Sequence, residues 1–162
     1  MTVVGARIDN RLLHGIVATS WAPRSNATRV MVIDDDVAMN SAEKQAMRLG
    51  RPAGMATSII TKEVALNNFK KHKYDKQRVF IVSKTPDIFL ELLNIDVEIS
   101  KLVLGGTLTD DTAIKVTNRA YISQVQIPIY QSILAKGCTI VSQYVPNDKE
   151  VNVRKFIDRG EK

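Results

Sequence analysis

One short segment, residues 6–15, combines an imidazole with two guanidinium groups and a carboxylate. His14 lies between residues 3–6, which are typical of a short strand, and an apolar stretch that is typical of a helix start. Unpaired N–H groups and the helix dipole favour an anion at such a position. Arg7 and Arg11 can donate charge-assisted hydrogen bonds to phosphate oxygens. Because histidine can also act as a nucleophile, we predict that His14 is transiently phosphorylated.

The same residues also admit a structural interpretation. A histidine that stands alone in a sequence is more often a hydrogen-bonded structural residue than a catalytic one. Arg7 and Arg11 can pair with Asp9 in a surface network that contributes little to stability. Spacing alone leaves both interpretations open, so the role of His14 depends on evidence from the rest of the chain.

Three stretches of the chain resemble one protein family. Residues 7–17 read RIDNRLLHGIV, and the match continues as far as Trp21. Two further stretches match strand ends of the same family: VMVIDDDVAMN at residues 30–40 and VLGGT at residues 103–107. Together they resemble the IIB components of the bacterial phosphoenolpyruvate-dependent sugar phosphotransferase system, mannose/fructose/sorbose family. The resemblance covers nearly the whole chain and implies a single IIB domain over residues 1–162.

The resemblance implies a phosphohistidine–sugar phosphotransferase that serves sugar import. A IIA component would donate phosphate to His14, which would pass it to a hexose or N-acetylhexosamine bound by membrane IIC and IID components. The family carries the phosphate on Nδ1, so a hydrogen bond that the sequence does not identify would fix Nε2. Arg11 would neutralise the phosphoryl group and Asp9 would orient an arginine, whereas Arg7 is the more structural of the two arginines. Gly15 would remove side-chain bulk where the backbone approaches phosphate.

Composition favours a cytoplasmic location, and the resemblance implies peripheral association with a membrane permease. The 162 residues contain one cysteine, so no intramolecular disulfide can form. No apolar run approaches the roughly 20 residues needed to span a bilayer, and no signal peptide opens the chain. The net charge of +6 is mild and dispersed apart from residues 70–73, which argues against nucleic acid and suits docking of an acidic partner. The resemblance also allows a homo-oligomer.

Strands and helices are expected to alternate along the chain. Apolar runs predict strands at residues 2–8, 28–34, 55–60, 78–83, 101–106 and 138–145. Capping residues and apolar spacing predict helices at 14–21, 37–49, 61–71, after Pro86, over 124–136, and after 146–148. Asp36 is the expected cap of the second helix, and residues 112–123 suggest a hairpin. This order predicts an α/β domain with a mostly parallel sheet and helices on both faces.

In such a sheet, ligands bind beyond the carboxyl ends of the strands. The segment that carries His14 follows the first strand, so residues that follow other strands should lie beside it. This set of candidate phosphate-binding or loop-binding residues contains Asp35, Ser83, Lys84, Gly105 and Gly106. Trp21 is expected to pack the first helix against the sheet.

The acidic triplet at residues 34–36 supports two other hypotheses, a magnesium site and a receiver-like signalling module phosphorylated on aspartate. A strand-end turn with a helix cap is a simpler explanation. A receiver would also need acidic residues after the first and third strands, and the third ends in Ile-Ile-Thr at 59–61. The Gly-Gly turn lacks the full nucleotide-binding pattern. We therefore expect no metal and no cofactor, and we expect Asp35 to hydrogen-bond the loop of His14.

Overall fold

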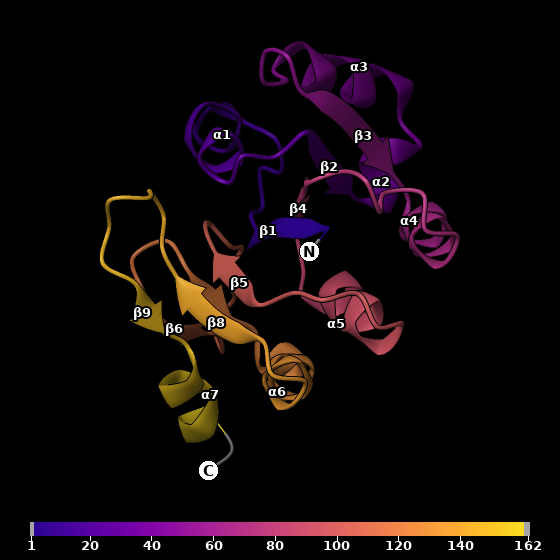
Figure 1. Cartoon of the computed structure of the whole chain (residues 1–162). Helices are drawn as coiled ribbons and strands as arrows, with labels where there is room; N and C mark the ends of the chain where they lie inside the picture. The colour runs from indigo at the N-terminus through magenta and orange to yellow at the C-terminus, as the bar shows by residue number, and fades with distance from the viewer. Residues whose placement is uncertain (1, 161–162) are drawn as a thin grey trace.

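The computed structural model describes residues 2–160, in which one sheet of seven strands forms the centre of the molecule (Figure 1). The remaining residues of the predicted domain, 1 and 161–162, lie outside the described part. In spatial order the strands are β3 (Ala56–Ile60), β2 (Arg29–Ile33), β4 (Val79–Ser83), β1 (Val3–Ile8), β5 (Lys101–Leu104), β8 (Thr139–Ser142) and β9 (Val151–Asn152). All neighbours pair in parallel except β9, which runs antiparallel to β8. The predicted α/β class with a mostly parallel sheet is therefore confirmed.

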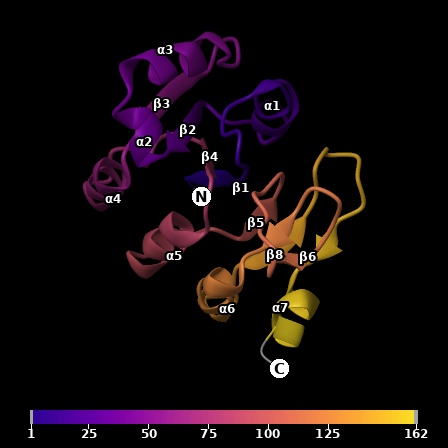
Figure 2. The same ribbon diagram turned by 180° about the vertical axis from the view of Figure 1, so that it is seen from behind.

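Helices cover both faces of this sheet, as Figure 1 and the reverse view in Figure 2 show. One face carries α4 (Lys62–Lys70), α5 (Asp87–Asn94) and α6 (Ile127–Ala135), with α7 (Arg154–Gly160) beside α6. The other face carries the π-helix η1 (Val17–Trp21), α1 (Ala22–Arg24), α2 (Asp35–Ala38) and α3 (Ser41–Leu49). A short 3₁₀ turn, η2 (Gln124–Gln126), leads into α6, and β6 (Ile114–Lys115) pairs with β7 (Tyr121–Ile122) as the predicted hairpin.

Alternating strand residues supply two separate cores. On β2, Met31 and Ile33 belong to the core under α4, α5 and α6, whereas Val30 and Val32 belong to the core under η1. All five residues of β4 are buried, as expected for a parallel strand covered on both faces. Burying each large aliphatic side chain stabilises the fold by about 1.5–3 kcal/mol. The two cores therefore hold β1 and its neighbours in a fixed position.

Prediction of the second helix was wrong in its cap and its continuity. The side chain of Asp34, not that of Asp36, accepts the N–H of Val37 and begins α2. The chain then leaves the helix at Met39, and Asn40 caps α3 by accepting the N–H of Glu43. Two strong capping residues six positions apart explain why one expected helix is divided into two.

Other differences lie in the second half of the chain and in the first helix. Pro128 falls in the first turn of α6, where its missing N–H costs no hydrogen bond, so the helix begins at Ile127. Strand β9 was not predicted because two residues carry too little pattern. The first helix contains the π-helical segment η1, whose wider turn is not apparent from apolar spacing.

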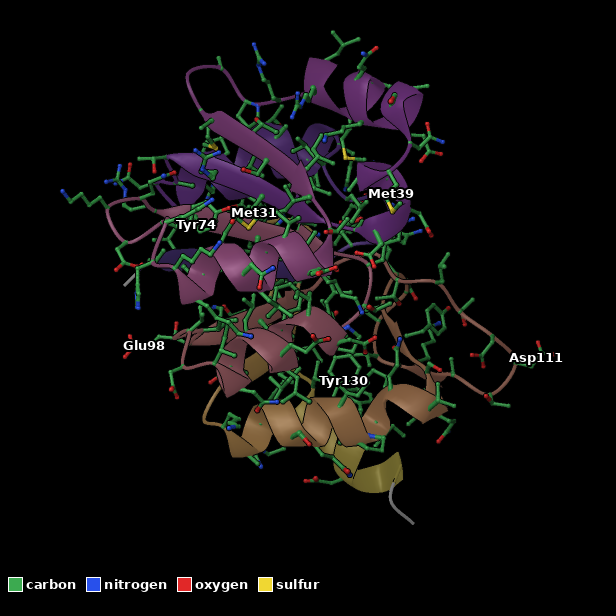
Figure 3. All side chains as sticks on the ribbon, turned by 90° about the vertical axis from the view of Figure 1, so that its right-hand side faces the viewer. Met31, Met39, Tyr74, Glu98, Asp111 and Tyr130 are labelled. Atoms are coloured by element: carbon green, nitrogen blue, oxygen red, sulfur yellow. The ribbon has the colours of Figure 1, made fainter. Side chains whose placement is uncertain are left out.

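The loops after β1, β2, β4 and β5 emerge at a common edge, as parallel pairing requires. Figure 3 labels residues at both ends of the strands. Met39 and Asp111, which follow β2 and β5, lie on one side, and Tyr74 and Glu98, which precede β4 and β5, lie on the opposite side. The first of these sides is the edge at which the sequence predicts a site.

The corrected cap can be tested by comparing Asp34→Ala with Asp36→Ala. We expect Asp34→Ala to lower the free energy of unfolding by about 1 kcal/mol, because the N–H of Val37 loses its acceptor. Asp36→Ala removes a charge from the same first turn without removing that bond, so its effect should stay within about 0.5 kcal/mol. Urea unfolding followed by circular dichroism measures both values, and equal losses would contradict the assignment of Asp34.

Candidate active site

The loop that carries His14 is attached to the strands on both sides of β1. The N–H of Asp9 donates to the carbonyl of Ser83 at 2.9 Å, and the N–H of Asn10 donates to the carbonyl of Gly106 at 2.8 Å. The N–H of Leu12 donates to the backbone carbonyl of Asp9 at 3.0 Å and closes a turn. Leu12 itself adopts a left-handed φ of 58°. That conformation is unfavourable for a branched side chain, and the burial of Leu12 in the core under η1 holds it.

The imidazole of His14 has a different contact on each nitrogen. Nε2 lies 3.1 Å from Oδ2 of Asp9, off the direction of a well-aligned ring N–H hydrogen bond. Nδ1 contacts the exposed guanidinium of Arg11. The ring is mostly buried, with 12 % of the side chain exposed. The Asp9 carboxylate therefore supplies the contact to Nε2 that the sequence left unidentified.

Asp9 connects the groups of this site to one another. Its Oδ1 accepts the backbone N–H of Arg11 at 3.1 Å, while Oδ2 lies 3.3 Å from Nε of Arg7. Burial raises the pKa of this carboxyl, but contacts with His14, with the Arg11 N–H and with Arg7 outweigh burial, so the pKa lies below its ordinary value. Asp9 is therefore a buried carboxylate that stays ionised at neutral pH.

Arg7 is fully buried and supports Asp9 from inside the sheet. Its Nη1 donates to the carbonyl of Gln143 at 2.9 Å, and its Nη2 donates to the carbonyl of Tyr144 at 3.0 Å. Burial lowers the pKa of the guanidinium, and the Asp9 carboxylate opposes this effect. Gly105 leaves the room that the guanidinium needs, because a Cβ there would overlap it. Arg7 therefore reaches the site only through Asp9 and two backbone carbonyls, and its burial places it away from any bound group.

Trp21, at the end of η1, contacts both Arg7 and one of the carbonyls that bind Arg7. The guanidinium of Arg7 lies 4.6 Å from the centre of the Trp21 ring, and Trp21 Nε1 donates to the carbonyl of Tyr144 at 2.9 Å. The predicted packing of Trp21 between the first helix and the sheet is confirmed. One backbone carbonyl, that of Tyr144, therefore accepts from both Arg7 and Trp21.

The arrangement favours one tautomer of His14. A carboxylate beside Nε2 favours the proton on that nitrogen, which leaves the lone pair on Nδ1. The donor on Nδ1 is the Arg11 guanidinium, an exposed group that can exchange this contact for phosphate oxygens. The surface ion pair between Arg11 and Asp9 that the sequence allowed does not form through their side chains. The imidazole is therefore arranged as a nucleophile at Nδ1 with a cation beside it.

The other residues expected at this edge differ from one another in how they relate to the loop of His14. Ser83 and Gly106 hold the loop through their backbone carbonyls, and a Cβ on Gly106 would lie 3.1 Å from Oδ1 of Asn10. The space around Gly15 is open, so the protein itself does not require a glycine there. Lys84 lies 3.9 Å from Asp34 at the neighbouring strand end.

The expectation that Asp35 hydrogen-bonds the loop of His14 is not met. Its carboxylate accepts the N–H of Lys62, at the start of α4. Asp34 caps α2, so the acidic triplet serves two helix starts and does not form one acidic pocket. The receiver-like alternative is therefore not favoured.

A comparison with protein-family models decides the family. The model described as "PTS system sorbose subfamily IIB component" matches residues 3–162. The chain belongs to this family. The IIB chain has the fold of the IIB domain of the sorbose permease from Klebsiella pneumoniae, with a TM-score of 0.89, 26% identity and 98% of each chain covered.

Two curated relatives extend the comparison. The IIB chain is 25% identical over 155 residues to the N-acetylgalactosamine-specific phosphotransferase enzyme IIB component 2 of Escherichia coli (strain K12), covering 96% of this chain and 98% of the relative. It is 26% identical over 161 residues to the mannose-specific EIIAB component of the same strain. That match includes 99% of this chain, which spans half the length of the EIIAB relative.

Sequence reasoning missed Gln143 and Tyr144 as parts of this site. They contribute backbone carbonyls to Arg7, across separations of 136 and 137 residues. Every residue type has a backbone carbonyl, so these contacts do not depend on residue type and no sequence motif could have found them. The one available signal was the predicted strand at residues 138–145, which contains both residues; in the structure β8 pairs in parallel with β5.

The requirement for space at Gly105 can be tested against Gly15 as a matched position. We expect Gly105→Ala to lower the free energy of unfolding by about 1–3 kcal/mol, because the added methyl group displaces the buried Arg7 guanidinium. Gly15→Ala adds the same group in open space within a helical turn and should be neutral or stabilising by up to about 1 kcal/mol. Equal destabilisation of the two variants in urea would show that Arg7 does not need this space.

Asp9 should make stability depend on pH. Its pKa is lower in the folded protein than the ordinary value of 3.8, so its contribution is present above that value and is lost as the pH falls below it. At pH 7 we expect Asp9→Asn to cost about 3 kcal/mol, because Arg7 stays buried without its carboxylate. The difference from wild type should shrink at acid pH.

Urea unfolding of wild type, Asp9→Asn and the exposed control Asp36→Asn at pH 7 and near pH 3 measures this effect. The control should differ little from wild type at either pH. An unchanged Asp9→Asn difference at the two pH values would refute the linkage.

Proposed function

We propose that His14 is the phosphoryl carrier of a sugar phosphotransferase system. The observation that carries the proposal is the pair of contacts on its ring, with Asp9 on Nε2 and Arg11 on Nδ1. Membership of the IIB family supports the same chemistry. A IIA component donates the phosphoryl group, and a hexose or N-acetylhexosamine bound by membrane IIC and IID components accepts it.

Asp9 offsets the charge that phosphorylation creates. When the Nδ1 lone pair forms a bond to phosphorus and the bond to the donor breaks, the ring that keeps its Nε2 proton becomes cationic. The carboxylate 3.1 Å from Nε2 stabilises that cation, as the aspartate of a catalytic triad does. Transfer to a sugar hydroxyl breaks the N–P bond, forms a P–O bond and returns the ring to its neutral state, while the hydroxyl proton passes to solvent water.

Arg11 changes partner during this cycle. In the resting protein its guanidinium contacts Nδ1, the atom that must attack phosphorus. The incoming phosphoryl group displaces it and offers equatorial oxygens to the same N–H donors. Because Arg11 is exposed and its side chain has no carboxylate partner among the described residues, this movement breaks no ion pair.

The partners follow from the family and from the place of the site. His14 lies on a loop at one edge of the sheet, within reach of a docking protein. One relative of the chain bears the name EIIAB, which supports a IIA donor. Among the described residues no helix is long and apolar enough to cross a bilayer. In this proposal, separate IIC and IID chains bind the sugar, and the IIB chain works at the cytoplasmic face of that permease.

Phosphate transfer from labelled phosphoenolpyruvate tests the carrier. With the general phosphotransferase proteins and a cognate IIA, we expect acid-labile and alkali-stable label on wild type and none on His14→Ala. Circular dichroism would confirm that the variant is folded. Label that persists on His14→Ala, or alkali-labile label on wild type, would refute the assignment and favour phosphorylation elsewhere.

The role of Arg11 is tested by the rate of the same reaction. We expect Arg11→Gln to slow phosphorylation of His14 about a hundredfold, because the transition state loses a cationic donor. Arg48→Gln removes the same charge from an exposed position on α3 and should leave the rate near that of wild type. If the two variants slow the reaction equally, net charge and not the position of Arg11 governs the rate.

A further inference from the structure

A polar hollow of about 270 Å³ adjoins the reactive loop and has no role in the steps above. Asp9, Asn10 and Arg11 form one wall. The rest of the lining comes from residues 106–107, the β6–β7 hairpin and the segment after β8, and includes Asn118, Arg119, Tyr121 and Tyr144. Figure 2 shows the hairpin beside β8, and Thr117 contacts Ser142 across that junction.

Two guanidinium groups of this hollow lack acidic partners. Neither the Arg11 nor the Arg119 side chain pairs with a carboxylate among residues that the structure describes. Asp9, the carboxylate in the wall, is occupied by Arg7, His14 and the backbone of Arg11. The hollow therefore has an excess of positive charge, which favours an anion with several oxygens.

Arg119 is held in place although it is exposed. Its guanidinium lies 4.1 Å from the centre of the Tyr144 ring, and its backbone carbonyl accepts the N–H of Thr107 at 3.0 Å. Tyr144 is itself anchored, because its carbonyl accepts from Arg7 and Trp21. An arginine stacked on a fixed aromatic ring loses less conformational freedom when it binds an anion than a free surface arginine does.

The other lining groups match a sugar. Asn10 and Asn118 bring amide groups that can both donate to and accept from hydroxyls, and Tyr121 and Tyr144 bring aromatic rings. The volume lies just below the roughly 300–1,000 Å³ typical of small-molecule sites, which suits one monosaccharide. Arginines for a phosphate and amides for hydroxyls are the groups that recognise a sugar phosphate.

We propose that the hollow between Arg11 and Arg119 binds the phosphorylated monosaccharide formed at His14. This inference rests on the proposed function, since it makes the hollow the place of the product. Arg11 and Arg119 contact the phosphate, and the amides contact the sugar hydroxyls. The hollow is thereby assigned to a phosphomonoester of a hexose, not to the free sugar.

Nuclear magnetic resonance titration of the full unphosphorylated chain tests the proposal. The probes are mannose 6-phosphate, N-acetylgalactosamine 6-phosphate, mannose and inorganic phosphate. We expect at least one sugar phosphate to shift the amide resonances of Asn10, Gly106, Asn118 and Arg119 in a saturable manner. Mannose should cause no such shift, and inorganic phosphate should bind more weakly than the sugar phosphate.

Two variants examine the residues that carry the inference. Arg119→Gln should weaken sugar-phosphate binding about tenfold, through loss of a charge-assisted hydrogen bond. Tyr144→Leu keeps the charge but removes the ring beneath it, and should weaken binding about threefold. Arg48→Gln, which removes a charge from α3, should bind as wild type does. The amide spectrum of each variant also reports whether it is folded.

The inference is overturned if neither sugar phosphate shifts these resonances, if inorganic phosphate binds equally well, or if folded Arg119→Gln binds as wild type does. Phosphorylation of His14 by IIA is measured separately on the same preparations. Label on His14 without sugar-phosphate binding would refute the proposed sugar-phosphate site but not the carrier role of His14. Sugar-phosphate binding without label would refute the carrier role of His14. The hollow would then be a sugar-phosphate site with a different function.

Discussion

The buried contact between Arg7 and Asp9 is the interaction on which the site depends. Arg7 has no exposed surface, and its charge is tolerated because a carboxylate and two backbone carbonyls surround it. Asp9 in turn holds the imidazole and the backbone of the loop. The orientation of the His14 ring is thereby determined inside the sheet, where the cores on both faces resist displacement.

Gly105 and the strained backbone of Leu12 both support the site that is built on the contact between Arg7 and Asp9. Gly105 directly follows β5, the strand that pairs with β1 beside Arg7, and leaves the volume of a methyl group to the guanidinium. Leu12 takes a left-handed conformation two residues before His14, and its buried side chain offsets the cost. The loop therefore has one well-defined path from the end of β1 to η1. Such a path suits the carrier role that we propose for His14.

Much of this arrangement could be predicted from sequence, and the remainder has a physical explanation. Branched apolar runs identified the parallel strands, and parallel pairing then placed the loops of Asp9 and Gly106 at one edge. Asp35 was misplaced because a carboxylate after a strand can accept an N–H at the start of any nearby helix, and here it accepts that of Lys62 in α4. The carbonyls of Gln143 and Tyr144 could not be predicted, because every residue type offers one.

The contact between Arg7 and the segment after β8 also sets an order of events during synthesis. His14 leaves the ribosome early, but the carbonyls that hold Arg7 belong to residues made 136 and 137 positions after Arg7. Until β8 has docked beside β5, Arg7 lacks two acceptors and Asp9 has no rigid support. A nascent or truncated chain therefore carries the histidine motif without a competent site. Under the proposed function, only chains that have completed their sheet would accept phosphate.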